Sequence, residues 1–106
     1  MSYSEKIKGV IEDSDVALFM KGTPTFVMCG NSDRALNALR RAGAPVTAVD
    51  ILRDPAIRQE LSALSGWPTI PQVFVGGKFV GGCDIVREMH AKGELAPLLR
   101  RAVEPH

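Results

Sequence analysis

The sequence has few of the residues on which several protein classes depend. It contains only two cysteines, Cys29 and Cys83, far apart in the chain, so it has neither a C-x-x-C pair nor a disulfide framework. With only His90 and His106 beside them, the chain is a poor match for a structural zinc site. A bond between the two cysteines is compatible with the sequence, and in a reducing compartment we expect it to be transient rather than structural.

Aromatic residues, unbalanced charge and long apolar runs are scarce as well. The formal net charge is +1, and no basic stripe is interleaved with the one Trp, one Tyr and four Phe, so a nucleic-acid partner has little support. The longest apolar run, Val16–Met20, is too short to cross a membrane. The polar N-terminal segment lacks the apolar core of a secretory signal. We therefore expect a cytoplasmic protein that has no membrane partner.

The length of the chain suits one compact domain, which we assign to residues 1–106. In the first half, apolar spacing predicts a helix with Ser4 as its N-cap, and then a strand over 16–20 that is buried on both faces. Gly22 and Pro24 lie in the next segment and predict a loop, after which a helical period runs over 31–41.

The second half begins with β-type sequence and contains a hairpin signal. A strand is predicted over 46–52. Two short strands, 72–75 and 78–80, flank the pair Gly76-Gly77, and both glycines can adopt the positive φ that a tight hairpin turn requires.

Three helices complete the second half. The first begins at Asp54-Pro55, the second near Asp84 and the third after Gly93. Their predicted inward faces are Ile57, Leu61 and Leu64; Ile85, Val86 and Met89; and Leu95, Leu98, Leu99 and Ala102. A strand–helix–strand unit requires a right-handed crossover with parallel pairing, to which the hairpin adds antiparallel strands. The expected fold class is therefore α/β: a thioredoxin-like fold with a four-stranded mixed sheet flanked by helices.

Cys29 is the main candidate for chemistry. It lies where a loop meets a predicted helix, and the N–H groups and dipole at a helix start stabilise a thiolate. Lys21 adds a favourable charge. The alternative is an inert buried cysteine. Ser32 stands where a C-x-x-C protein has its resolving cysteine, so a redox cycle needs an external thiol; a serine at this position is also typical of a helix cap.

Other candidates have ordinary explanations of equal or greater weight. Pro71 precedes a strand, and sequence alone favours a trans Ile70–Pro71 bond over a cis bond that would free the Ile70 backbone for pairing. Asp84 is typical of a helix cap. Arg58 fits a solvated surface charge, and Trp67 fits a packed loop residue.

Four segments in this order resemble the monothiol glutaredoxins of the C-G-F-S class. They are Lys21-Gly-Thr-Pro24 with the loop to Cys29-Gly30, Val49-Asp-Ile-Leu52, Trp67-Pro-Thr-Ile-Pro-Gln72 and Val80-Gly-Gly-Cys-Asp-Ile85. The resemblance runs over about residues 5–99, and the four segments together are specific although each alone is weak.

The resemblance implies a cis Pro71 and a groove for glutathione. In that groove Lys21 and Arg58 would meet the glycyl carboxylate, and Thr69 and Ile70 would pair with the cysteinyl backbone. The γ-glutamyl end would be held by the Cys83 backbone and Asp84.

The resemblance also implies a [2Fe–2S] cluster shared between two protomers. Cys29 of each protomer and two glutathione thiols would ligate it, giving a homodimer with the cluster and a monomer without it. Family members pass clusters to iron–sulfur acceptor proteins, often partner BolA-like proteins and show weak oxidoreductase turnover.

One position departs from the family pattern. Asn31 replaces the phenylalanine of C-G-F-S, and a polar amide admits water where an apolar ring would shield the site. Two alternatives to cluster carriage therefore stay open: a glutathione-dependent oxidoreductase that removes glutathione from protein thiols, and an interaction module without either activity.

Overall fold

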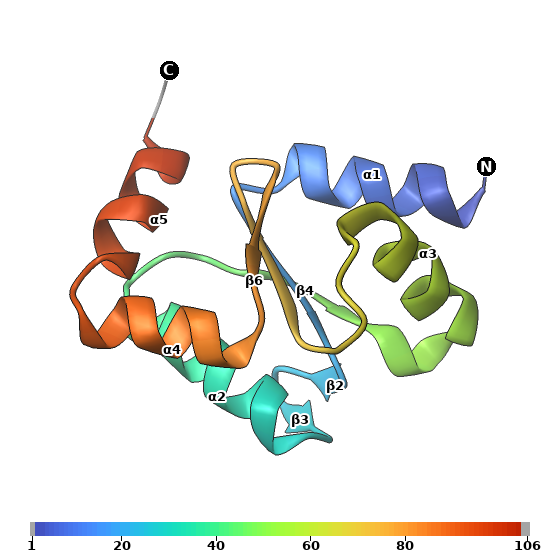
Figure 1. The fold of residues 1–106 in the computed structure, drawn as a ribbon, viewed down its shortest axis with the longest axis horizontal. Helices are drawn as coiled ribbons and strands as arrows, with labels where there is room; N and C mark the ends of the chain where they lie inside the picture. Colours follow the sequence, from blue (N-terminus) through green and yellow to red (C-terminus); the bar gives the residue numbers. More distant parts are fainter. Residues whose placement is uncertain (1, 105–106) are drawn as a thin grey trace.

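The computed structural model describes residues 2–104, and it arranges helices around a central sheet (Figure 1). The elements run in the order α1 (Tyr3–Asp13), β1 (Val16–Met20), β2 (Gly22–Thr23), β3 (Phe26–Val27), α2 (Gly30–Arg41), β4 (Thr47–Asp50), the 3-10 helix η1 (Ile51–Arg53), α3 (Pro55–Ser65), β5 (Gln72–Val75), β6 (Lys78–Gly81), α4 (Cys83–Ala91) and α5 (Leu95–Val103).

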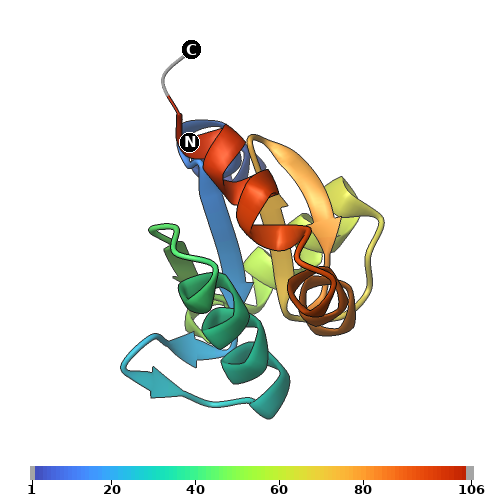
Figure 2. The ribbon, with the colours of Figure 1, turned by 90° about the vertical axis from the view of Figure 1, so that its left-hand side faces the viewer.

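The main sheet has four strands in the order β4-β1-β5-β6. β1 pairs with β4 in parallel, while β5 is antiparallel to both β1 and β6. Helices α1 and α3 cover one face, and α2, α4 and α5 cover the other, as Figures 1 and 2 both show. The predicted thioredoxin-like fold, with a mixed four-stranded sheet, is thereby confirmed.

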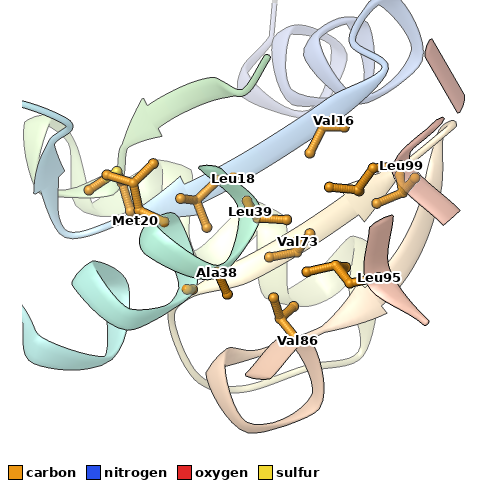
Figure 3. Packing of buried hydrophobic residues seen from close by; sticks show 12 residues of the cluster. Val16, Leu18, Met20, Ala38, Leu39, Val73, Val86, Leu95 and Leu99 are labelled. Atoms are coloured by element: carbon orange, nitrogen blue, oxygen red, sulfur yellow. The ribbon is translucent and has the colours of Figure 1, made fainter. Parts of the chain in front are cut away.

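Alternating side chains of β1 pack into two separate hydrophobic cores, one on each face of the sheet, and this is why the strand is apolar throughout. Val16, Leu18 and Met20 point toward α2, α4 and α5, where they meet residues such as Leu39 and Leu99 (Figure 3). Ala17 and Phe19 point the other way, against a cluster that includes Ile7, Ile11, Leu61 and Phe74. All five β1 side chains are buried, so the prediction of a strand buried on both faces is confirmed.

Several predicted boundaries shift by one to three residues. The N-cap of α1 is Ser2 rather than Ser4, since the Ser2 hydroxyl accepts a hydrogen bond from the N–H of Glu5 at 3.2 Å. The strand predicted over 46–52 is limited to β4, because the Asp50 carboxylate accepts the N–H of Leu52 and turns the chain into η1. The predicted loop before Cys29 contains the short β2–β3 ladder.

Two side chains assigned to inward faces lie outside the cores. Leu64 is 39% exposed and Ile85 is 40% exposed. Both sit near an end of their helix, and the helical period does not encode the packing around helix ends. The other predicted faces are buried at Leu61, Val86, Leu95 and Leu99, and the remaining members are partly buried.

Within residues 2–104, no helix combines the length and the apolar character needed to cross a lipid bilayer.

Candidate thiol site and adjoining groove

The β2–β3 ladder holds the chain that leads to Cys29. The N–H of Met28 donates to the carbonyl of Lys21 at 2.9 Å, which closes the loop over these two strands. Gly22 has φ +95°, and a Cβ there would overlap the Phe26 carbonyl oxygen and lie 2.8 Å from the Met28 nitrogen. Only glycine fits this close approach, so Gly22 fixes the path of the backbone into Cys29.

Cys29 is the N-cap residue of α2 and is free and partly exposed. The backbone N–H of Ser32 is the main cause of a lowered pKa of the Cys29 thiol. Partial burial opposes this shift, while the N–H of Asn31, the Ser32 hydroxyl and the charge of Lys21 add to it. The thiolate is thus stabilised at the helix start, as the position of Cys29 predicts.

Ser32 has a different role from the cap that its position suggested. Its side chain is fully buried, and its hydroxyl accepts the N–H of Lys21 at 3.1 Å. The same hydroxyl helps to lower the pKa of Cys29. Ser32 therefore ties the end of β1 to the thiol, a function that helix-start statistics do not reveal.

A groove of about 320 Å³ lies next to the thiol, where the loop before β5 meets the start of α4. It brings together most of the predicted glutathione contacts: Thr69, Ile70, Pro71, Cys83 and Asp84. The Ile70–Pro71 bond is cis. Larger cavities of about 570 and 610 Å³ elsewhere contain none of the predicted site residues.

The Gln72 side chain supports the loop that forms one wall of this groove. The amide nitrogen of Gln72 donates to the carbonyls of Trp67 and Thr69, at 2.9 and 3.1 Å. A Cβ on Gly82 would lie 3.2 Å from the Pro71 carbonyl oxygen, so a glycine allows the start of α4 to approach this wall closely. Trp67 packs on Phe79 as a loop anchor would, but it also lines the groove, which its sequence context did not predict.

Three predicted residues lie outside the groove lining. Two of them, Cys29 and Lys21, lie beside the groove, because Asn31, two residues after the thiol, forms part of the groove wall. Arg58 is an exposed residue of α3 and is not among the residues that line the groove. The structure thus brings the groove residues to the thiol but does not bring Arg58 into the cavity.

Cys83 differs chemically from Cys29. Its side chain is buried, and burial is the main cause of a raised pKa of its thiol, which the charges of Arg87 and Arg34 only partly offset. Cys83 is therefore the less reactive of the two free thiols.

The described part of the chain has no group of three or more His, Cys, Asp or Glu side chains that could hold a metal ion. His106, which the sequence analysis weighed as a zinc ligand, lies outside the described residues. Cys29 is the one lowered-pKa thiol among the residues described, so a single chain supplies one sulfur of this kind to any metal.

Comparison with known proteins identifies the family. The sequence model described as "Glutaredoxin" matches residues 16–80. Glutaredoxin 4 of Haemophilus ducreyi is 45% identical over 106 residues, covering 100% of this chain and 99% of the relative. Monothiol glutaredoxin-S11 of Oryza sativa subsp. japonica is 45% identical over 98 residues, which are 92% of this chain but 20% of that longer protein.

Solved structures agree. The holo form of glutaredoxin C1 from Populus tremula x tremuloides superposes with a TM-score of 0.86 at 32% identity, over 97% of this chain and 91% of that one. A buckwheat glutaredoxin–glutathione complex superposes with a TM-score of 0.84 at 29% identity, over 94% and 89% of the two chains. The chain belongs to the glutaredoxin family, among the monothiol glutaredoxins.

Proposed function

We propose that this protein binds glutathione in the groove beside Cys29 and uses the two thiols together. The observation that carries the proposal is a single thiol of lowered pKa, placed at a helix start next to a groove that ends at a second helix start. A chain with one activated thiol and serine at the third position after it needs an external sulfur to complete its chemistry.

The groove offers suitable partners for each part of the tripeptide. The extended backbone around Thr69 and Ile70 can pair with the cysteinyl unit, and the Cys83 backbone with Asp84 can hold the γ-glutamyl end. Lys21 and Arg58 are the cations proposed for the glycyl carboxylate. A related buckwheat glutaredoxin forms a complex with glutathione, which supports glutathione as the ligand.

The principal activity proposed is carriage of a [2Fe–2S] cluster as cargo. Such a cluster takes four sulfur ligands, and the donor set fits if two protomers each contribute Cys29 and one bound glutathione. The cluster supplies the iron–sulfur unit that acceptor proteins receive. The protein would be a homodimer with the cluster and a monomer without it, and a BolA-like protein is a proposed partner.

Removal of glutathione from protein thiols is the second candidate, and Asn31 favours it. The Asn31 side chain is exposed, lines the groove and gives the site a polar wall. The Cys29 thiolate would attack the glutathione sulfur of a mixed disulfide and release the protein thiol. A second glutathione would then attack the Cys29–glutathione bond, so that glutathione disulfide leaves and the thiolate is restored.

A reducing compartment, the cytoplasm, is proposed for this activity, since both described cysteines are free and a thiolate is required.

Anaerobic reconstitution with iron, sulfide and glutathione tests the proposal. We expect a coloured species of about twice the 11.4 kDa monomer mass. Cys29→Ser should abolish the colour and any removal of glutathione from a mixed disulfide, whereas Cys83→Ser, the matched control, should retain most of both. A persistently colourless monomer would refute cluster carriage, and equal behaviour of the two variants would refute Cys29 as the working thiol.

A further inference from the structure

A second depression lies between α2 and α4, beside the groove described above, and its rim is basic. Its volume is about 370 Å³. Four basic side chains line it, Arg34 and Arg41 from α2 and Arg87 and His90 from α4, around a floor of Asn37, Ala38 and Ala91. No acidic side chain belongs to this lining. We call it the basic groove.

The positive charge of the basic groove does not follow from the net charge of the chain. The whole chain carries a net charge of only +1, so three arginines in one depression represent a local concentration of charge. Within residues 2–104 the one salt bridge joins Lys92 to Glu88, and the arginines of the groove therefore have no carboxylate partner there. Their charge is available to a ligand.

Stabilisation of the helices through their dipoles explains the positions of only some of these basic side chains. Arg41 and His90 lie in the last turns of α2 and α4, where cations offset the helix dipole. Arg34 and Arg87 each occupy the fifth position of their helix, outside the last turn, where a cation gains nothing from the dipole. A ligand explains their placement better than helix stability does.

The basic groove adjoins the thiol site. The Arg34 guanidinium donates to the Asn31 amide oxygen at 3.1 Å, and Asn31 lines the glutathione groove. The charges of Arg87 and Arg34 both act on the thiol of Cys83, and Cys83 lines that groove too. A ligand in the basic groove would therefore lie next to whatever is held at Cys29.

The shape of the basic groove favours a protein segment over a small anion. Arg34 and Arg41 are seven residues apart on one helix, so the charges extend over about 10 Å rather than converging on one point. The walls are the sides of two helices, which offer none of the free backbone N–H groups typical of a phosphate site. No aromatic ring lines it for base stacking.

We propose that the basic groove docks an acidic segment, rich in Asp and Glu, of the protein partner that Cys29 and glutathione serve. This rests on the proposed function, because the occupant is assigned by its proximity to the thiol. Complementary charge at a rim mainly increases association rate and partner selectivity, so the basic groove would select which partner reaches the thiol.

The test uses the full chain, labelled for NMR, and two peptides that differ only in six consecutive glutamates or six glutamines. The glutamate peptide should shift signals of α2 and α4 around the basic groove, and about 1 M salt should abolish the shifts. Arg41→Glu should weaken its binding about fivefold or more, whereas Arg40→Glu, with the same charge change on the neighbouring exposed residue, should weaken it by less than twofold.

Several outcomes would overturn the inference. The first is equal binding of the two peptides or equal effects of the two variants. The second is stronger binding of inorganic pyrophosphate or of a single-stranded oligonucleotide than of the glutamate peptide. A glutathione titration of the same sample separates the two proposals: glutathione binding without peptide binding refutes only the docking surface, and peptide binding without glutathione binding refutes the assignment of the occupant as a partner of Cys29.

Discussion

The thiolate of Cys29 is stabilised mainly by neutral hydrogen-bond donors rather than by a cation. The N–H of Ser32 contributes most to its lowered pKa, and the charge of Lys21 contributes least. Oriented N–H groups at a helix start act over a short range, inside the region that salt screens poorly. The reactivity of the thiol should therefore depend more on the local backbone than on ionic strength.

A pH titration of alkylation follows from this arrangement. Because the pKa of Cys29 is lowered, its thiolate should persist to lower pH than that of a free cysteine and disappear only as the pH falls through the lowered value. The alkylation rate by iodoacetamide should therefore show a midpoint below about 8.5, the value typical of a free thiol.

Cys83 provides the internal control for this titration. Burial raises the pKa of its thiol, so Cys29→Ser should leave only a slow reaction with a midpoint above that of a free thiol. A midpoint for Cys29 at or above the free-thiol value would contradict the proposed activation.

Substitution of Asn31 tests whether water at the groove limits the cluster. Asn31 is exposed and is held by Arg34, so its amide presents a polar surface at the site. Asn31→Phe should replace this surface with an apolar ring and prolong the lifetime of a reconstituted cluster in air severalfold, measured by visible absorption. Asn31→Ala removes the amide without adding a shield, and a longer lifetime in both variants would implicate the Arg34 contact instead of water.

At the level of single residues, the sequence indicated the reactive thiol but not what holds it. A cysteine before a helical period is visible in the sequence, since helix starts have a local signature. The contact between Ser32 and Lys21 and the support of the groove loop by Gln72 join segments through the tertiary fold. No local pattern reports such contacts.

The elements around the site are linked by the end of β4. One carboxylate oxygen of Asp50 accepts the N–H of Gly22 at 3.0 Å and the N–H of Leu52 at 2.9 Å. It therefore joins the β2 strand, which leads to the thiol, to the start of η1. The sequence predicted a longer strand here because β propensity carries no information about this carboxylate.

Removing that carboxylate should loosen both elements. Asp50→Ala leaves two N–H groups without their acceptor, and we expect a loss of about 2 kcal/mol in the free energy of unfolding, measured in urea. Asp50→Asn keeps an acceptor oxygen and should lose less than half as much. If Asp50→Ala unfolds at the same urea concentration as the unchanged protein, the link between β2 and η1 contributes nothing to the free energy of unfolding.

Most elements were nevertheless predictable, because their local sequence signals are strong. β1 is apolar at every position since both faces of the sheet are covered. The Gly76-Gly77 turn has the positive φ values, 58° and 81°, that the hairpin signal requires. The wrong predictions for Leu64 and Ile85 concern residues near helix ends, where burial depends on tertiary packing that the helical period does not encode.

On the scale of the whole molecule, the proposed cluster would need more sulfur ligands than one chain supplies. Residues 2–104 have no cluster of metal-binding side chains, and Cys83 is buried with a raised pKa. A four-sulfur shell therefore requires a second copy of the chain and two external thiols. The cluster itself, rather than a large protein interface, would hold the two copies together, so the dimer should exist only while all four sulfurs are available.

An analogue that fills the groove without a thiol tests this arrangement. S-methylglutathione keeps both carboxylates and the amine of glutathione, so it should occupy the groove lined by Thr69, Ile70 and Asp84. It lacks a free sulfur for the metal, and excess S-methylglutathione should therefore prevent the coloured dimer from forming and leave the 11.4 kDa monomer, measured by sedimentation with visible detection. The carboxylate-free thiol 2-mercaptoethanol, added at the same excess, controls for general loss of the cluster. A coloured dimer that forms equally well with S-methylglutathione as the only tripeptide would show that a glutathione thiolate is not among the ligands, because the analogue cannot form one.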